Sequence, residues 1–145
     1  MADGSSMNRG RTPIVVGIVA VAVLIIVAVI ATTQDEDGTT LANTSWVVSD
    51  IQGVDLAADV EATAAFTDTD VQAHGGCNSA NGSYTTSGDS IEISPMASTL
   101  IACEDPIMTM ESAFLARLQA AETYSIDGQT LTIDGSAGPI VMTAA

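Results

Sequence analysis

The sequence predicts an α+β fold in which a mostly antiparallel β-sheet, or a small barrel-like sheet, packs against one helix. A single transmembrane helix is expected to precede it. Three observations predict this arrangement. An uninterrupted apolar run lies near the N-terminus, short alternating segments separated by turns follow it, and one later stretch has helical periodicity. A chain of 145 residues suits one such domain, not two.

The apolar run, Ile14 to Ala31, contains no polar or charged side chain. A helix of this length spans about 27 Å, close to the hydrocarbon core of a bilayer. Arg9 and Arg11 precede the run and three acidic residues follow it, so the positive-inside rule predicts a cytoplasmic N-terminus and an exported domain. A cleaved signal peptide is the alternative, because residues 29–31 offer a small-residue cleavage site. The run is longer than the usual apolar core of a signal peptide, which favours an anchor.

This run divides the chain into a cytoplasmic tail (1–13), a transmembrane signal anchor (14–31), an acidic linker (32–40) and an extracytoplasmic domain (41–145).

The formal net charge is −15, with three arginines, no lysine and 18 acidic residues. Nucleic-acid binding needs clustered cationic side chains, so this composition excludes it. It also excludes a protein that lies on anionic lipid through a basic face. Beyond Ala31 only Arg117 opposes 17 of the acidic residues, so the negative charge belongs to the exported part.

Strand signals dominate the exported part. Alternating or β-branched runs bounded by turn residues predict strands at 45–48, 61–66, 70–73, 82–86, 90–94, 123–126, 129–134 and 139–142. Residues 67–69 are the expected turn between the second and third of these strands. Several short antiparallel strands of this kind are typical of a small barrel or sandwich.

Two glycine turns predict hairpins and their register. A two-residue loop within Ser87-Gly88-Asp89 would place Tyr84 on the same face as Ile91 and Ile93. The pair Asp127-Gly128 suits the positive φ angles of a type I′ turn. With those two residues as the loop, Tyr124 would face Leu131 across the strand pair.

One helix is expected between the strands. Asp105 is the predicted N-cap, and Pro106 suits the first helical position. The apolar residues that follow recur at helical spacing, with one more beside them: Ile107, Met110, Phe114, Leu118 and Leu115. We interpret this stripe as core rather than as a cofactor or partner surface.

The two cysteines, Cys77 and Cys103, allow two interpretations. In an exported domain an even cysteine count suggests a disulfide, which would stabilise the fold by about 3 kcal/mol in the chain-entropy model. The alternative is two separate buried thiols that pack as small apolar side chains.

Catalytic and metal signals are weak. His74 lies near Cys77, but no cation is close in sequence to lower the thiol pKa, and paired glycines more often mark a bend. One histidine and two cysteines do not make a zinc spacing. The acidic groups at 35–37 and 68–70 lack the frame of a calcium loop. We therefore expect no enzymatic activity, no metal and no cofactor.

A run of short motifs resembles the META domains found in HslJ-like heat-shock proteins. The motif residues that match are Gly75, Gly76, Cys77 and Asn78, then Gly82 and Tyr84, then Thr99 and Cys103, and finally Glu111. Flanking matches are Leu41, Trp46, Val48, Ile51 and Gly53 upstream, and Tyr124, Gly128 and Leu131 downstream. The resemblance covers about Leu41 to Met142, nearly the whole predicted domain.

The resemblance implies a compact, mostly antiparallel β fold with a packed helix. It also implies an exported or membrane-anchored protein associated with heat shock, stress response and envelope integrity, without an established enzymatic activity. It supplies no ligand. This chain departs from many members of the family because it has an apolar spanning segment where they have a lipoprotein cysteine, and because it is unusually acidic.

The sequence therefore predicts a non-enzymatic, membrane-anchored extracytoplasmic module with a role in envelope stress tolerance. Its partners would be an unknown envelope component and the membrane, through the one N-terminal helix, with no nucleic acid. An alternative is a small-ligand binder that uses the mouth of the barrel-like sheet, lined by Trp46, Tyr84 and Tyr124. A third hypothesis, a hydrolase that uses Cys77 with His74, has the least support.

Overall fold

The computed structural model describes residues 40–145. The predicted tail (1–13), the predicted transmembrane anchor (14–31) and all but the last residue of the predicted linker (32–40) lie outside the described residues. Among residues 40–145, no helix is long and apolar enough to cross a membrane. Residues Thr40–Ala145 form one unit with its own core.

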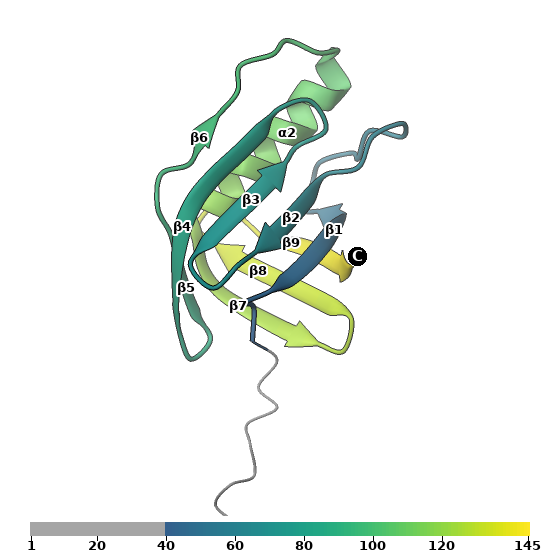
Figure 1. The fold of residues 1–145 in the computed structure, drawn as a ribbon. Coiled ribbons are helices and arrows are strands. Elements are labelled where there is room, and N and C mark those ends of the chain that lie inside the picture. Colours follow the sequence, from purple (N-terminus) through teal and green to yellow (C-terminus); the bar gives the residue numbers. More distant parts are fainter. Residues whose placement is uncertain (1–39) are drawn as a thin grey trace, which may run out of the picture. The chain divides into compact units, whose positions relative to one another are not determined.

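The described part contains nine strands and one helix, labelled as in Figure 1. Their bounds are β1 Thr44–Ile51, β2 Thr63–Phe66, β3 Asp70–His74, β4 Ser79–Ser87, β5 Ser90–Ile93, β6 Ala97–Ser98, α2 Asp105–Gln119, β7 Ala121–Asp127, β8 Thr130–Gly135 and β9 Ile140–Ala144. The eight strands predicted from the sequence and the helix are all present, within a few residues at each end. The two-residue strand β6 was not predicted.

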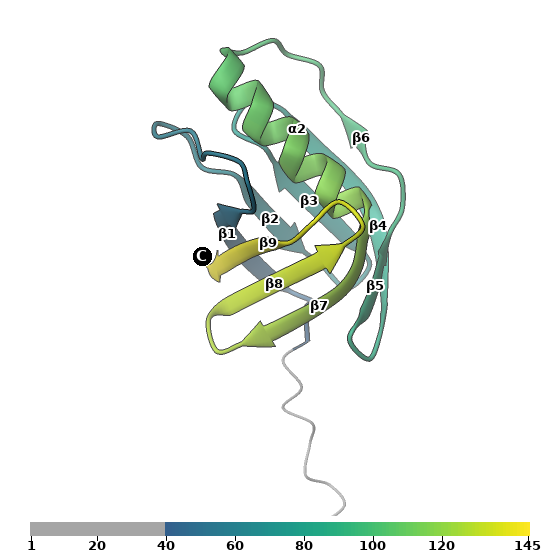
Figure 2. The same ribbon diagram turned by 180° about the vertical axis from the view of Figure 1, so that it is seen from behind.

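Eight strands close into an antiparallel barrel. The order β3-β2-β1-β9-β8-β7-β5-β4 is completed by a further pairing between β3 and β4, and β6 pairs with β4 as a ninth strand. Helix α2 packs against the barrel, behind β3 and β4 in Figure 1 and in front of them in Figure 2. The barrel-like sheet with one packed helix, predicted from the strand and helix patterns, is confirmed.

The interior of the barrel is an apolar core. Its largest fully buried side chains include Phe66, Phe114, Ile51, Leu131 and Met142, which come from both halves of the barrel and from α2. Burial of this apolar surface is the main free-energy term that favours the fold. The rings of Phe66 and Tyr84 meet edge to face at 5.1 Å between centroids, a favourable geometry for an aromatic pair.

Helix α2 buries the predicted apolar stripe. Met110, Phe114 and Leu118 are at most 1% exposed, which confirms that they belong to the core, whereas Ile107 and Leu115 are half-buried. The N-cap prediction was wrong by one residue, because the capping residue is Glu104 and its side chain makes no capping hydrogen bond. A disulfide at Cys103 fixes the chain directly before the helix, so the entry into α2 does not depend on a capping side chain.

The β4–β5 hairpin has the predicted register. Ser87 pairs with Ser90, so the loop has two residues, and Gly88 has the positive φ of +62° that such a loop requires. Tyr84 lies opposite Ile93, and both are buried, as is Ile91.

The β7–β8 hairpin differs from the prediction. Asp127 pairs with Thr130, so the loop is Gly128 and Gln129 rather than Asp127 and Gly128, and Tyr124 faces Ile133 rather than Leu131. Only Gly128 in this loop has a positive φ, at +58°, which fits a glycine at the first loop position of a type II′ turn rather than a type I′ turn. Moving the loop by one residue shifts the pairing by two, so every side chain keeps its face. Alternation alone therefore could not separate the two registers.

Candidate functional site

The loop between β3 and β4, residues 75–78, carries the centre of the sequence motif. The backbone N–H of Gly75 donates to the carbonyl of Asn78 at 3.0 Å, which closes a tight bend. Gly76 has a φ of +106°, a conformation that favours glycine. A Cβ on Gly75 would lie 2.7 Å from Oε2 of Glu111, so only glycine leaves room for that side chain.

Glu111 reaches this loop from α2 and is only 4% exposed. Its Oε2 accepts hydrogen bonds from the backbone N–H groups of Cys77 at 3.1 Å and Asn78 at 2.6 Å. Its Oε1 accepts from the Asn78 side-chain amide at 2.6 Å. Three donors therefore converge on one buried carboxylate, the arrangement in which hydrogen bonds to a charge are strongest.

The pKa of Glu111 lies below its ordinary value. Burial raises the pKa, but the hydrogen bonds from Asn78 and Cys77, with a smaller contribution from His74, outweigh that effect. Because the pKa is lowered, the side chain is ionised at neutral pH. The hydrogen bonds from the loop thus favour the ionised form of a carboxylate inside the protein.

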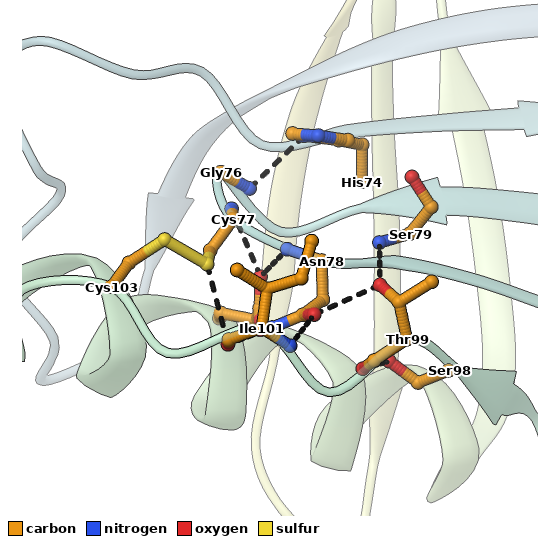
Figure 3. Close-up of a disulfide and its surroundings, with 10 residues drawn as sticks. His74, Gly76, Cys77, Asn78, Ser79, Ser98, Thr99, Ile101 and Cys103 are labelled. Atoms are coloured by element: carbon orange, nitrogen blue, oxygen red, sulfur yellow. Dashed lines mark hydrogen bonds between the residues drawn. A yellow bond between two sulfur atoms is a disulfide. The ribbon is translucent and has the colours of Figure 1, made fainter.

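Asn78 links this carboxylate to the segment between β6 and α2, residues 99–104, which we call the strap. The Asn78 side chain is buried, and its Oδ1 accepts hydrogen bonds from the Thr99 hydroxyl at 2.8 Å and the Ile101 N–H at 2.6 Å. Its Nδ2 also donates to the Ile101 carbonyl at 2.9 Å (Figure 3). One buried amide therefore joins the loop, the helix and the strap.

A disulfide between Cys77 and Cys103 joins the same loop and strap covalently. The two Cα atoms are 6.1 Å apart, and Figure 3 shows the bridge beside the Asn78 hydrogen bonds. His74 does not form a catalytic pair with Cys77, because Cys77 is bonded to Cys103 and has no free thiol, and His74 Nδ1 accepts a hydrogen bond from the Gly76 N–H at 3.1 Å. The residues of the hydrolase hypothesis therefore do not form a nucleophile and a base in this structure.

The remaining motif residues also support the fold. A Cβ on Gly82 would lie 3.1 Å from Met96 and 3.2 Å from the Ser94 carbonyl, so glycine lets the β5–β6 connection cross close to β4. Tyr84 is buried and donates its hydroxyl to the Thr67 carbonyl at 2.6 Å. Each of the nine motif residues therefore makes a contact that supports the fold, or lies directly beside one: Gly75, Gly76, Cys77, Asn78, Gly82, Tyr84, Thr99, Cys103 and Glu111.

The three aromatic residues proposed to line a ligand site lie in or against the core. Trp46 is 3% exposed and donates its indole N–H to the Thr44 hydroxyl at 2.7 Å. Tyr84 is buried, and Tyr124 is half-buried and packs on the core. The barrel interior therefore does not present these rings to a ligand.

An open groove of about 860 Å³ lies elsewhere, on the outer face of β1 to β4 and β6. Its lining includes Gln72, His74, Asn81 and several serine, threonine and alanine residues. Of the three aromatic residues predicted to line a ligand site, Trp46 is in this lining and Tyr84 and Tyr124 are not; the position of the groove on the outer face was not predicted. The available signal was the small and amide side chains at the solvent-facing positions of consecutive strands.

The candidate acidic site at residues 68–70 does not form a metal centre in the described part of the chain. Asp68 accepts a hydrogen bond from the Asn43 amide at 2.8 Å, and Asp70 accepts one from the Thr69 hydroxyl at 2.8 Å. Within residues 40–145, no three His, Cys, Asp or Glu side chains are grouped so that they could hold a metal ion. The acidic residues at 35–37 lie outside the described residues.

Comparison with solved structures supports the fold. An NMR structure of a protein from Burkholderia xenovorans is 20% identical, covers 72% of this chain and 83% of its own, and has a TM-score of 0.61. A second NMR structure, 13% identical, covers 75% of this chain and 95% of its own, with a TM-score of 0.62. No curated protein sequence matches the chain. Residues 39–145 match the sequence profile of the META domain, and this shows that the chain belongs to the META domain family.

Proposed function

We propose that this protein is a non-enzymatic, membrane-anchored extracytoplasmic META-domain protein with a role in the stress tolerance of the cell envelope. The observation that carries the proposal is that the motif residues hold parts of the fold together. The motif residues Glu111 and Asn78 and the two cysteines, including Cys77 of the hydrolase hypothesis, are all engaged in holding the strap and α2 to the barrel.

The proposed location is supported by the charge distribution and by the disulfide. Arg9 and Arg11 precede the apolar run 14–31, and 17 acidic residues follow it, which favours export of the C-terminal part. Disulfides such as Cys77–Cys103 persist in oxidising compartments and are rare in the cytosol. Both features are consistent with a domain on the outer side of the membrane.

A topology experiment tests the location. A reporter that is active only outside the cytoplasm is fused after Ala145, in the full chain and in a chain that lacks residues 14–31. We expect activity in the membrane fraction from the full chain and none from the truncated chain. A full-chain fusion that is produced but inactive, or reporter activity that appears in the medium after cleavage, would contradict the anchored topology.

A deletion strain tests the role. Its survival under heat and under envelope-directed antibiotics is compared with that of strains that carry the intact gene or the version lacking residues 14–31. We expect reduced survival after deletion and rescue only by the full chain. Equal survival of the deletion and parent strains under every stress would argue against the proposed role.

A second candidate function, a small-ligand-binding module of the envelope, is favoured by one observation. The outer face of β1 to β4 and β6 carries a groove of about 860 Å³, within the size range of small-molecule sites. The site differs from the one expected at the mouth of the barrel, because it lies on the outer face and offers amides and hydroxyls. Of the three predicted aromatic residues, Trp46 is in its lining, but it is buried.

A further inference from the structure

The floor of the outer groove consists of two rows of side chains that cross the sheet. The strand register places Ser45, Ala65, Gln72, Asn81 and Ala97 side by side on β1, β2, β3, β4 and β6. All five are at least partly exposed, so this row lies on the outer face of the barrel. The row is continuous across five neighbouring strands.

The second row runs parallel to the first. Thr63 on β2 pairs with His74 on β3, which pairs with Ser79 on β4. The Thr99 N–H donates to the Ser79 carbonyl at 3.0 Å, so the strap continues this row beyond β4. Both rows line the groove of about 860 Å³.

The two rows are uncharged in a strongly acidic domain. Residues 40–145 contain 14 acidic side chains and one arginine, yet neither row contains an acidic residue. The one acidic side chain that lines the groove is Asp70, which belongs to neither row. A cationic ligand would find more favourable sites elsewhere on this surface, and an anionic ligand would be repelled by the domain as a whole. The groove therefore suits a neutral ligand.

The rows offer unused hydrogen-bonding groups. Gln72 lies directly opposite Asn81, and neither side-chain amide has a hydrogen-bond partner among the described residues. His74 Nδ1 accepts from Gly76, so in the neutral ring Nε2 carries the proton and is a donor (Figure 3). Adjacent amides, an imidazole N–H and the serine hydroxyls can together donate to and accept from the hydroxyl groups of a ligand.

The dimensions favour a chain-like ligand. Four strand spacings of about 4.8 Å separate β1 from β6, so the first row is about 19 Å long. Small side chains such as Ala65, Thr63 and Ala97 keep the floor low along this length.

A peptide that bound by adding a strand to the sheet would need free backbone groups, but the backbone of β2, β3 and β4 is already paired on both sides.

We propose that this groove binds a neutral oligosaccharide, with the Gln72 and Asn81 amides as the central hydrogen-bonding pair. This activity goes beyond the proposed structural role of the motif residues and does not depend on it. Trp46 is the one aromatic residue among the described residues that line the groove, and it is only 3% exposed. A sugar therefore has no open ring to stack on, and we expect fast exchange and weak binding per sugar unit.

Saturation-transfer difference NMR on the full chain in lipid nanodiscs tests this proposal. The probes are linear neutral tetrasaccharides (maltotetraose, cellotetraose and tetra-N-acetylchitotetraose), and an oligogalacturonate of the same length is the anionic control. We expect signals from at least one neutral probe and none from the anionic one. Absence of signals from all three neutral probes at millimolar concentration would overturn the proposal, as would equal signals from the anionic control.

Two variants and one matched control test the assigned residues. The double variant Gln72→Ala/Asn81→Ala removes the amide pair, and we expect affinity to fall at least about tenfold, equivalent to about 1.4 kcal/mol. Ala65→Phe fills the floor while it keeps both amides, and it should also abolish the signal. Gln129→Ala removes an exposed amide from the β7–β8 turn and should bind as the parent does. Undiminished binding by both groove variants, with unchanged unfolding curves, would show that the groove is not the site.

Discussion

The buried network around Asn78 and the outer groove differ in how their polar groups are used. In the network, the Glu111 carboxylate and the Asn78 amide are buried, and each polar atom has at least one partner. In the groove, Gln72 and Asn81 are exposed and have no partner among the described residues. The first region contains the motif residues of the family, and the second contains the groups that remain available to a ligand.

This difference separates the role of the family motif from the search for a binding site. A polar group that is already satisfied inside the protein can bind a ligand only by giving up an existing hydrogen bond, which makes it a poor recognition group. The network is therefore expected to determine stability, and the groove is expected to determine recognition. Four predictions test this division, from the largest expected effect on stability to the smallest.

Replacing Glu111 with alanine should have the largest effect. The change leaves the N–H groups of Cys77 and Asn78, and the Asn78 amide, without their buried acceptor. We expect the free energy of unfolding to fall by about 3–5 kcal/mol. Denaturant unfolding of the full chain measures it, with the exposed Glu122→Ala as the control. A loss below about 1 kcal/mol would show that the network contributes little to the fold.

Removing the disulfide should have the next largest effect. The double variant Cys77→Ala/Cys103→Ala frees the strap from the loop but leaves the Asn78 hydrogen bonds in place. We expect a loss of about 3 kcal/mol, mainly from greater freedom of the unfolded chain. Hydrogen exchange at Ile101 should stay slow, because Asn78 still accepts its N–H. Fast exchange at Ile101 would mean that the disulfide alone holds the strap.

The pH dependence of stability should reveal the Glu111 carboxylate. Its folded pKa is lower than the unfolded value, so its contribution is fully present above the unfolded pKa and is lost as pH falls through the folded pKa. Melting temperatures of the parent and Glu111→Gln are compared from neutral to acidic pH. The parent should be the more stable at neutral pH, and the gap should narrow as the medium becomes acidic. A gap that is independent of pH would contradict an ionised Glu111.

Replacing the groove amides should have the smallest effect on stability. Gln72 and Asn81 are exposed and bond to no other described side chain, so the double alanine variant should change the free energy of unfolding by less than about 0.5 kcal/mol. Denaturant unfolding of this variant is compared with that of the parent. A loss as large as that for Glu111→Ala would mean that the groove is a second structural centre.

The sequence predicts the local elements of this fold well. The β4–β5 hairpin follows from alternation and a glycine turn, and the α2 stripe follows from helical spacing. The predicted β7–β8 register was wrong because two loop choices give the same faces. Gly128 has a positive φ in either choice, and the two are separated by Asp127, which lacks the positive φ that a type I′ turn requires. Local pattern therefore identifies the elements and their faces, but it does not determine every register.

The long-range features could not be predicted from local pattern. Glu111 was singled out only by family resemblance, although its position on the buried stripe between Met110 and Phe114 was a possible signal. The groove depends on β4 pairing with both β3 and β6, and these contacts join residues far apart in the chain. Alternation shows that Gln72 faces solvent, but it does not show which side chains lie beside it.

The disulfide has a consequence for proteolysis. Cys77 and Cys103 are 26 positions apart, and β4, β5 and β6 all lie between them. The bridge therefore closes this stretch into a covalent ring. A protease that cuts the β4–β5 turn or the strap once opens the ring without releasing any fragment, and the two halves of the domain stay attached. A domain built in this way stays in one covalent piece after a single cut in the β4–β5 turn, and the halves separate only when a reductant opens the disulfide.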